Sequence, residues 1–264
     1  MDRDDTLRRA EKLLRQGRLD GAIEEYASVV AANPRDWATA NLLGDLFIRA
    51  GRTDRAVAQY ARIAEQLADD GFLSKAAALY KKIVKITPDD EQALLRTAEL
   101  AAQQGLPADA RQVLHTLFQR RVKAGDLEGA AGIANRLPVL DPDDMTGRID
   151  AARMLAEIGD APGAADHLRV AGDTFAEQGR EADALRAWRE SMRLNPADTQ
   201  AQEQVTRTLV RHGDLDGALA SAHSVAGRRA VAAAMLQAGR DEACIALLRQ
   251  VLDVEPDHVD TRLQ

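Results

Sequence analysis

The sequence predicts an all-α protein built from stacked helical repeats, and three observations support that prediction. Prolines recur every 54 residues, at Pro34, Pro88, Pro142 and Pro196. Glycines recur at alternating intervals of 34 and 20 residues, which together give the same period. Hydrophobic residues make up 45% of the 264 residues but aromatic residues only 3%, so the core must be aliphatic and rich in alanine. Such a core suits close helix packing better than it suits strands.

The periodic residues mark the ends of helices. A proline lacks an N–H and restricts the residue before it, so it ends a helix, and a following Asp can cap the next helix. A glycine after an apolar stretch suits the left-handed position just beyond a helix. The glycines concerned are Gly17, Gly51, Gly71, Gly105, Gly125, Gly159, Gly179 and Gly213.

Apolar residues between these marks follow helical spacing. In 19–32 the stripe contains Leu19, Ile23, Tyr26 and Val30, and a comparable stripe runs through 72–86. No segment shows the alternation of a strand. We therefore predict about sixteen helices of roughly 12–17 residues joined by short turns.

The spacing of small, aromatic and proline residues within these helix pairs resembles the tetratricopeptide repeat. The pattern is a turn glycine, a small residue five positions later, an aromatic residue four positions after that, and a terminal proline. It occurs in Gly17, Ala22, Tyr26 and Pro34, in Gly71, Ala76, Tyr80 and Pro88, and in Gly179, Ala184, Trp188 and Pro196. The resemblance implies a right-handed α/α solenoid that binds a protein or peptide along the concave face of its first helices.

The 20-residue intervals depart from that family's pattern. The helix over 54–69 must serve both as the second helix of one repeat and as the first helix of the next. We expect one repeat domain over 1–264, in units 1–36, 37–90, 91–144, 145–198 and 199–264, with irregular curvature. Six extra residues before Gly239 predict a broken or bent helix near Ala226, Gly227 and Arg228.

The C-terminal segment 257–264 is expected to begin another helix. Solenoids usually close with a polar capping helix, and none follows here. Either the chain is part of a longer protein, or it self-associates through this end.

Composition argues against several classes of partner and location. The chain has 35 basic and 42 acidic residues, a formal charge of -7, whereas nucleic-acid binders usually concentrate basic residues on one face. A single cysteine, Cys244, permits no disulfide within the chain. No run of about 18 apolar residues predicts a membrane span. We expect a cytoplasmic protein with no nucleic-acid partner and no membrane insertion, and the Ala and Arg usage is typical of bacteria.

No catalytic residue, metal site or cofactor is predicted. Cys244 falls where other repeats carry alanine, so it is expected to be a small buried hydrophobe. Acid pairs such as Asp89 and Asp90 follow prolines, where helix capping explains them. The recurring aromatic residues Tyr26, Tyr60, Tyr80 and Trp188 are expected to pack between helices.

The candidate functional surface is the one that the resemblance implies on the first helices. The predicted partner-binding residues are Asn41, Asp45, Arg49, Glu65, Asp69, Leu95, Glu99, Gln103, His115, Gln119, Ile149 and Arg153. One subfamily grips C-terminal carboxylates with Lys, Asn and basic residues. The matching positions here hold Leu7, Glu11, Leu42, Ala58 and Arg62, and only Arg62 fits, so that clamp is not expected.

The predicted function is therefore a non-catalytic scaffold or adaptor. Two alternatives remain open at this stage: a substrate-recruiting domain of a larger enzyme, and a structural module that self-assembles.

Overall fold

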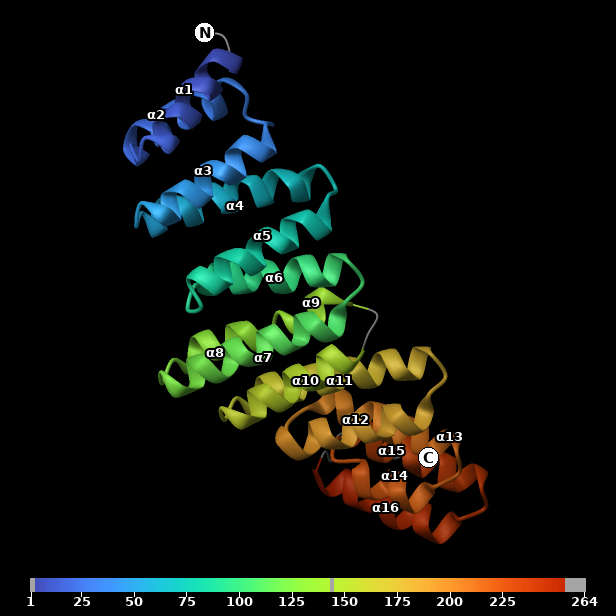
Figure 1. The fold of residues 1–264 in the computed structure, drawn as a ribbon. Helices are drawn as coiled ribbons and strands as arrows, with labels where there is room; N and C mark the ends of the chain where they lie inside the picture. The colour runs from blue at the N-terminus through green and yellow to red at the C-terminus, as the bar shows by residue number, and fades with distance from the viewer. Residues whose placement is uncertain (1–2, 143–144, 255–264) are drawn as a thin grey trace. The chain divides into compact units, whose positions relative to one another are not determined.

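A computed structural model describes residues 3–142 and 145–254, and those residues form helices joined by short turns, with no strand among them (Figure 1). The all-α repeat architecture is confirmed, with sixteen helical segments. They are α1 (Arg3–Arg15), α2 (Leu19–Ala32), α3 (Trp37–Arg49), α4 (Thr53–Asp69), α5 (Leu73–Ile86), α6 (Glu91–Gln103), α7 (Pro107–Lys123), α8 (Leu127–Ala134), α9 (Leu137–Leu140), α10 (Met145–Glu157), α11 (Ala161–Glu177), α12 (Glu181–Leu194), α13 (Thr199–Arg211), α14 (Leu215–Ser221), α15 (Val225–Gln237) and α16 (Asp241–Val254). The expected helix over 257–264 lies outside the described residues.

The chain divides into two compact units, residues 1–120 and 121–264. In the first unit, the helices from α1 to α6 each pack on the next one along the chain. Its core is centred on side chains with almost no exposure, among them Leu46, Tyr60, Ile63, Ile83 and Leu100. Burying a side chain of this size stabilises a fold by roughly 1.5–3 kcal/mol relative to leaving it exposed.

Helix α4 confirms the prediction of a long helix over 54–69 that packs on both sides. Its buried residues are Ala56, Tyr60, Ile63, Ala64 and Leu67. These residues span a wide sector of the helix, so α4 contacts both α3 before it and α5 after it. A single broad apolar face thus serves two helix pairs.

The turns and caps follow the glycine and aspartate pattern of the sequence. Gly51 and Gly71 have φ angles of +71° and +82°, in the left-handed region that favours glycine. The carboxylate of Asp36 accepts a hydrogen bond from the Thr39 N–H at 3.1 Å, and Asp90 accepts one from Ala93 at 3.0 Å. Each bond satisfies an N–H that the first turn of the helix would otherwise leave unpaired.

The second unit has its own core around Trp188. Its fully buried members include Trp188, Val205 and Met235, and Cys244 is 3% exposed. Cys244 is therefore the small buried residue that the repeat pattern predicted.

Two helices of the second unit are interrupted. Pro138 lies at the start of the four-residue α9, where its missing N–H stops the preceding α8, and the sequence interpretation had not foreseen this break. The expected break near Ala226–Arg228 is found slightly earlier, at residues 222–224. Ser224 accepts a hydrogen bond from the Gly227 N–H at 3.0 Å, so residues 226–228 form the first turn of α15 instead.

Candidate partner-binding site

A first row of polar side chains joins α3 to α5. The Tyr60 hydroxyl, from α4, donates a hydrogen bond to Asp45 Oδ1 at 2.6 Å. The Lys82 ammonium pairs with the same carboxylate, lies 3.4 Å from Asn41 Oδ1, and sits 4.2 Å from the centre of the Tyr60 ring. A lysine over an aromatic face gains a cation–π attraction in addition to its ion pair. Asn41 and Asp45, both predicted from sequence, are therefore in one network.

A second row joins α4 to α6. The Tyr80 hydroxyl, from α5, donates to Glu65 on α4. The Arg96 guanidinium reaches Glu65 with its Nε at 2.8 Å and Glu99 with its Nη1 at 2.5 Å. Guanidinium groups bind carboxylates in this forked manner and hold their geometry more firmly than lysine does. The predicted residues Glu65 and Glu99 are thus neutralised by one arginine.

The hydrogen bonds keep both acceptor carboxylates ionised. Partial burial opposes the charge on Asp45, but the bonds from Lys82 and Tyr60 outweigh it, so the pKa of Asp45 lies below its usual value. The Arg96 guanidinium is the main cause of the lowered pKa of Glu65. Burial, together with the bond to Glu65, raises the pKa of Tyr80 to about 12. Each tyrosine is therefore a fixed donor at neutral pH.

The two rows lie on different sides of α4. Tyr60 belongs to the first row and Glu65 to the second, and a separation of five residues places them about 140° apart around a helix. The ion pair of the first row connects α3 with α5, and the ion pair between Arg96 and Glu65 in the second row connects α6 with α4. The predicted residues of the first unit therefore do not form one continuous row.

The remaining predicted residues differ in their surroundings. Arg49, Asp69, Gln103 and His115 are exposed, while Leu95 and Gln119 are partly buried. In the second unit, Ile149 packs against the core and Arg153 pairs with Asp150 at 3.3 Å.

Sequence reasoning missed the two cations, Lys82 and Arg96. A usable signal was present in the sequence, because an acidic residue stands fifteen positions before each core tyrosine or tryptophan. The pairs are Glu11 with Tyr26, Asp45 with Tyr60, Glu65 with Tyr80, and Asp173 with Trp188. In the last three pairs the carboxylate accepts a hydrogen bond from the aromatic side chain, whereas Tyr26 forms no such bond with Glu11. The spacing does not reveal which basic residue joins each pair.

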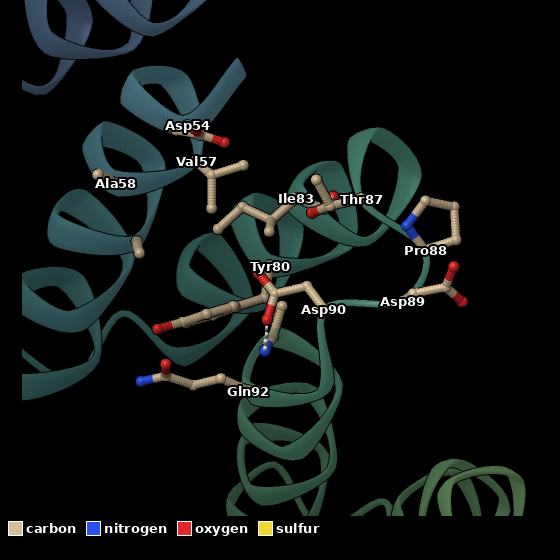
Figure 2. Close-up of a pocket in the computed structure, with 12 residues that line it drawn as sticks. Asp54, Val57, Ala58, Tyr80, Ile83, Thr87, Pro88, Asp89, Asp90 and Gln92 are labelled. Carbon is tan, nitrogen blue, oxygen red and sulfur yellow. Dashed lines mark hydrogen bonds between the residues drawn. The ribbon is translucent and has the colours of Figure 1, made fainter. Parts of the chain in front are cut away.

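An open pocket of about 640 Å³ adjoins the second row (Figure 2). Helix α4 lines it with Val57, Ala58 and Ala61, and α5 lines it with Tyr80 and Ile83. Figure 2 shows Val57 and Ile83 pointing toward one another across the hollow. The pocket is therefore mostly apolar in its interior, and it lies at the N-terminal ends of α4 and α6.

Within residues 3–142 and 145–254, no three His, Cys, Asp or Glu side chains are arranged to hold a metal ion. No helix over the same residues has the length and apolar content needed to cross a bilayer.

The family comparison matches the first half of the chain. Residues 7–72 and 65–117 match the model of the tetratricopeptide repeat family. The chain is also 31% identical over 214 residues to cellulose synthase 2 operon protein C of Komagataeibacter xylinus. That similarity covers 73% of this chain but only 16% of the longer relative.

Solved structures of repeat proteins are similar at low identity. The TPR domain of P58(IPK) is 17% identical, with 99% of this chain and 86% of that chain covered and a TM-score of 0.26. MamA protein is 17% identical over 73% of this chain and 97% of that chain, with a TM-score of 0.29. YrrB, described as a TPR protein with an unusual peptide-binding site, is 17% identical over 67% and 95%, with a TM-score of 0.26. Because these TM-scores are low, the solved structures do not indicate which residues of this chain bind a partner.

Proposed function

We propose that this chain, whose residues 7–72 and 65–117 match the tetratricopeptide repeat family, is a non-catalytic scaffold or adaptor that binds a protein or peptide segment along its helices. The observation that carries the proposal is the open pocket beside the row formed by Glu65, Arg96 and Glu99. A concave apolar site with a few fixed polar groups beside it is the usual form of a binding site.

The predicted residues that remain exposed are the contact residues of this proposal. Asp69 and Gln103 are exposed at the C-terminal ends of α4 and α6, and the pocket at the N-terminal ends of the same helices adds the exposed Asp54 and Gln92. Asp45 and Glu65 instead contribute to the fold, because each carboxylate fixes an aromatic residue and a cation. Their substitution would disturb packing as well as binding.

The test is affinity capture from lysate of the source organism with the full 264-residue chain. The surface variant carries Asp54→Lys and Gln92→Lys, at two exposed residues that line the pocket. The matched control carries Glu203→Lys and Gln200→Lys, which make the same change of charge at exposed positions of α13.

A protein that is retained by the wild type and the control, but lost by the surface variant, supports the proposal. Retention by all three chains, or by none, contradicts it. A cytoplasmic location is part of the same proposal, and cell fractionation tests it.

A further inference from the structure

The charged side chains that line the pocket have one sign. Its lining includes three carboxylates, those of Asp54, Asp89 and Asp90, and no lysine or arginine. Asp89 is paired with Arg120 at 3.3 Å, and Asp90 caps α6 through the Ala93 N–H. Asp54 lies in the first turn of α4, is exposed, and forms no hydrogen bond or ion pair with the described residues. The mouth of the pocket, where Asp54 lies, therefore has a negative charge that no basic side chain of the described residues neutralises.

An anionic ligand does not suit this pocket. The N-terminus of α6 faces it, and a helix N-terminus would ordinarily attract an anion. Here the Asp90 carboxylate already accepts the Ala93 N–H at 3.0 Å, so the position is occupied by the chain's own anion (Figure 2). An incoming carboxylate would also approach Asp54 and Asp89.

A long basic side chain fits both parts of the pocket. The methylene stem of arginine or lysine covers apolar surface while its charged head remains near water. The stem would lie on Val57, Ala58 and Ala61, and the head would lie near Asp54 at the mouth. No other class of side chain pairs with the acidic mouth and also buries apolar atoms against α4.

We propose that this pocket accepts an arginine or lysine side chain of the bound partner segment, with the charge recognised by Asp54. This inference rests on the proposed function, since it names the chemistry of the segment that the scaffold holds. It differs from recognition of a C-terminal carboxylate, for which the first-helix positions lack the required residues.

The test is methyl NMR on the full chain, labelled at alanine, valine and isoleucine methyl groups. The probes are N-acetyl-arginine amide, its neutral isostere N-acetyl-citrulline amide, and N-acetyl-glutamate amide. The arginine probe is expected to shift the methyl signals of Val57, Ala58, Ala61 and Ile83 in a saturable way. One exposed ion pair contributes up to about 1 kcal/mol, so citrulline should bind about fivefold more weakly.

Two variants and a control locate the effect. Asp54→Asn should weaken the arginine probe by the same factor as citrulline does, and Ala61→Leu should abolish the shifts by filling the pocket. Asp109→Asn, at an exposed position in the first turn of α7, should change nothing. Preserved spectra at distant methyl groups show that each variant is folded.

Equal binding of arginine and citrulline, tighter binding of glutamate, or no saturable shift with any probe would overturn this inference. These outcomes leave the capture experiment unaffected. Conversely, the arginine probe could bind more tightly than citrulline while the capture experiment retains no partner. That result would refute the proposed scaffold function but would still support the preference of the pocket for a basic side chain.

Discussion

Trp188 donates its indole N–H to Asp173, fifteen residues earlier in the chain, at 3.0 Å. The same separation joins Tyr60 to Asp45 and Tyr80 to Glu65. The residue just before two of these carboxylates is a glycine that the ring covers, Gly172 beside Trp188 and Gly44 beside Tyr60. The repeat therefore fixes a buried ring by an apolar contact and a charge-assisted hydrogen bond together.

Removing the Tyr60 hydroxyl should cost stability without changing the packed ring. Tyr60→Phe deletes the bond to Asp45 and is expected to lower the free energy of unfolding by about 1–2 kcal/mol. Urea denaturation followed by circular dichroism measures it. Tyr26→Phe is the matched control, because that hydroxyl forms no hydrogen bond with any described residue, and its effect should stay within about 0.5 kcal/mol. Equal effects would contradict the role of the Asp45 bond.

Gly44 should not tolerate a methyl group. An alanine Cβ at this position would lie 2.3 Å from Tyr60 Cε1, and Tyr60 is fully buried and unable to move aside. Gly44→Ala is therefore expected to destabilise the fold by about 1–3 kcal/mol. At Gly132, in α8, an added Cβ meets nothing within 4 Å. Gly132→Ala should be neutral or stabilising by up to about 1 kcal/mol, and a thermal melt that ranks the two variants otherwise would refute the prediction.

Acid should weaken the protein through Asp45 and Glu65. Their pKa values are lowered from the usual 3.8 and 4.5, so the folded state holds these carboxylates ionised more strongly than the unfolded state. The resulting stability is present above those usual values and is lost as pH falls through the lowered ones. Denaturation midpoints between pH 6 and pH 3 should fall less steeply for Glu65→Gln than for wild type. Glu24→Gln, an exposed change on α2, should retain the wild-type slope.

The break before α15 should depend on its cap. Ser224→Ala removes the acceptor of the Gly227 N–H bond and is expected to cost about 1 kcal/mol. Ser221→Ala is the control, because that hydroxyl only donates to the Gly217 carbonyl inside α14. Hydrogen exchange of the α15 amides should accelerate in the first variant alone, and similar exchange in both would show that the cap is unimportant.

Cys244 should react only after unfolding. At 3% exposure its thiol is shielded by the core of the second unit. A thiol-specific reagent is expected to label it slowly in buffer and completely in denaturant. Rapid labelling of the native chain would show that α16 opens readily.

The sequence by itself determined the class of fold and the position of most helix ends. Proline, glycine and aspartate act locally, through a missing N–H, a left-handed backbone and a capping oxygen, so their spacing is sufficient. It also identified the core aromatics and the double role of α4, since a broad apolar stripe is visible in the sequence. The end of α8 could also have been predicted from the sequence, because Pro138 lies at the start of α9 and lacks the N–H that would continue α8.

Tertiary structure decided which polar residues meet. Lys82 pairs with Asp45, 37 residues earlier in the chain, and Arg96 pairs with Glu65, 31 residues earlier. The spacing of residues within one helix cannot predict contacts between side chains so far apart in the sequence. The direction of each side chain around α4 divided the predicted residues of the first unit into two rows. The pocket likewise arises only when α4, α5 and the start of α6 are packed together, because its apolar walls and acidic mouth come from separate helices.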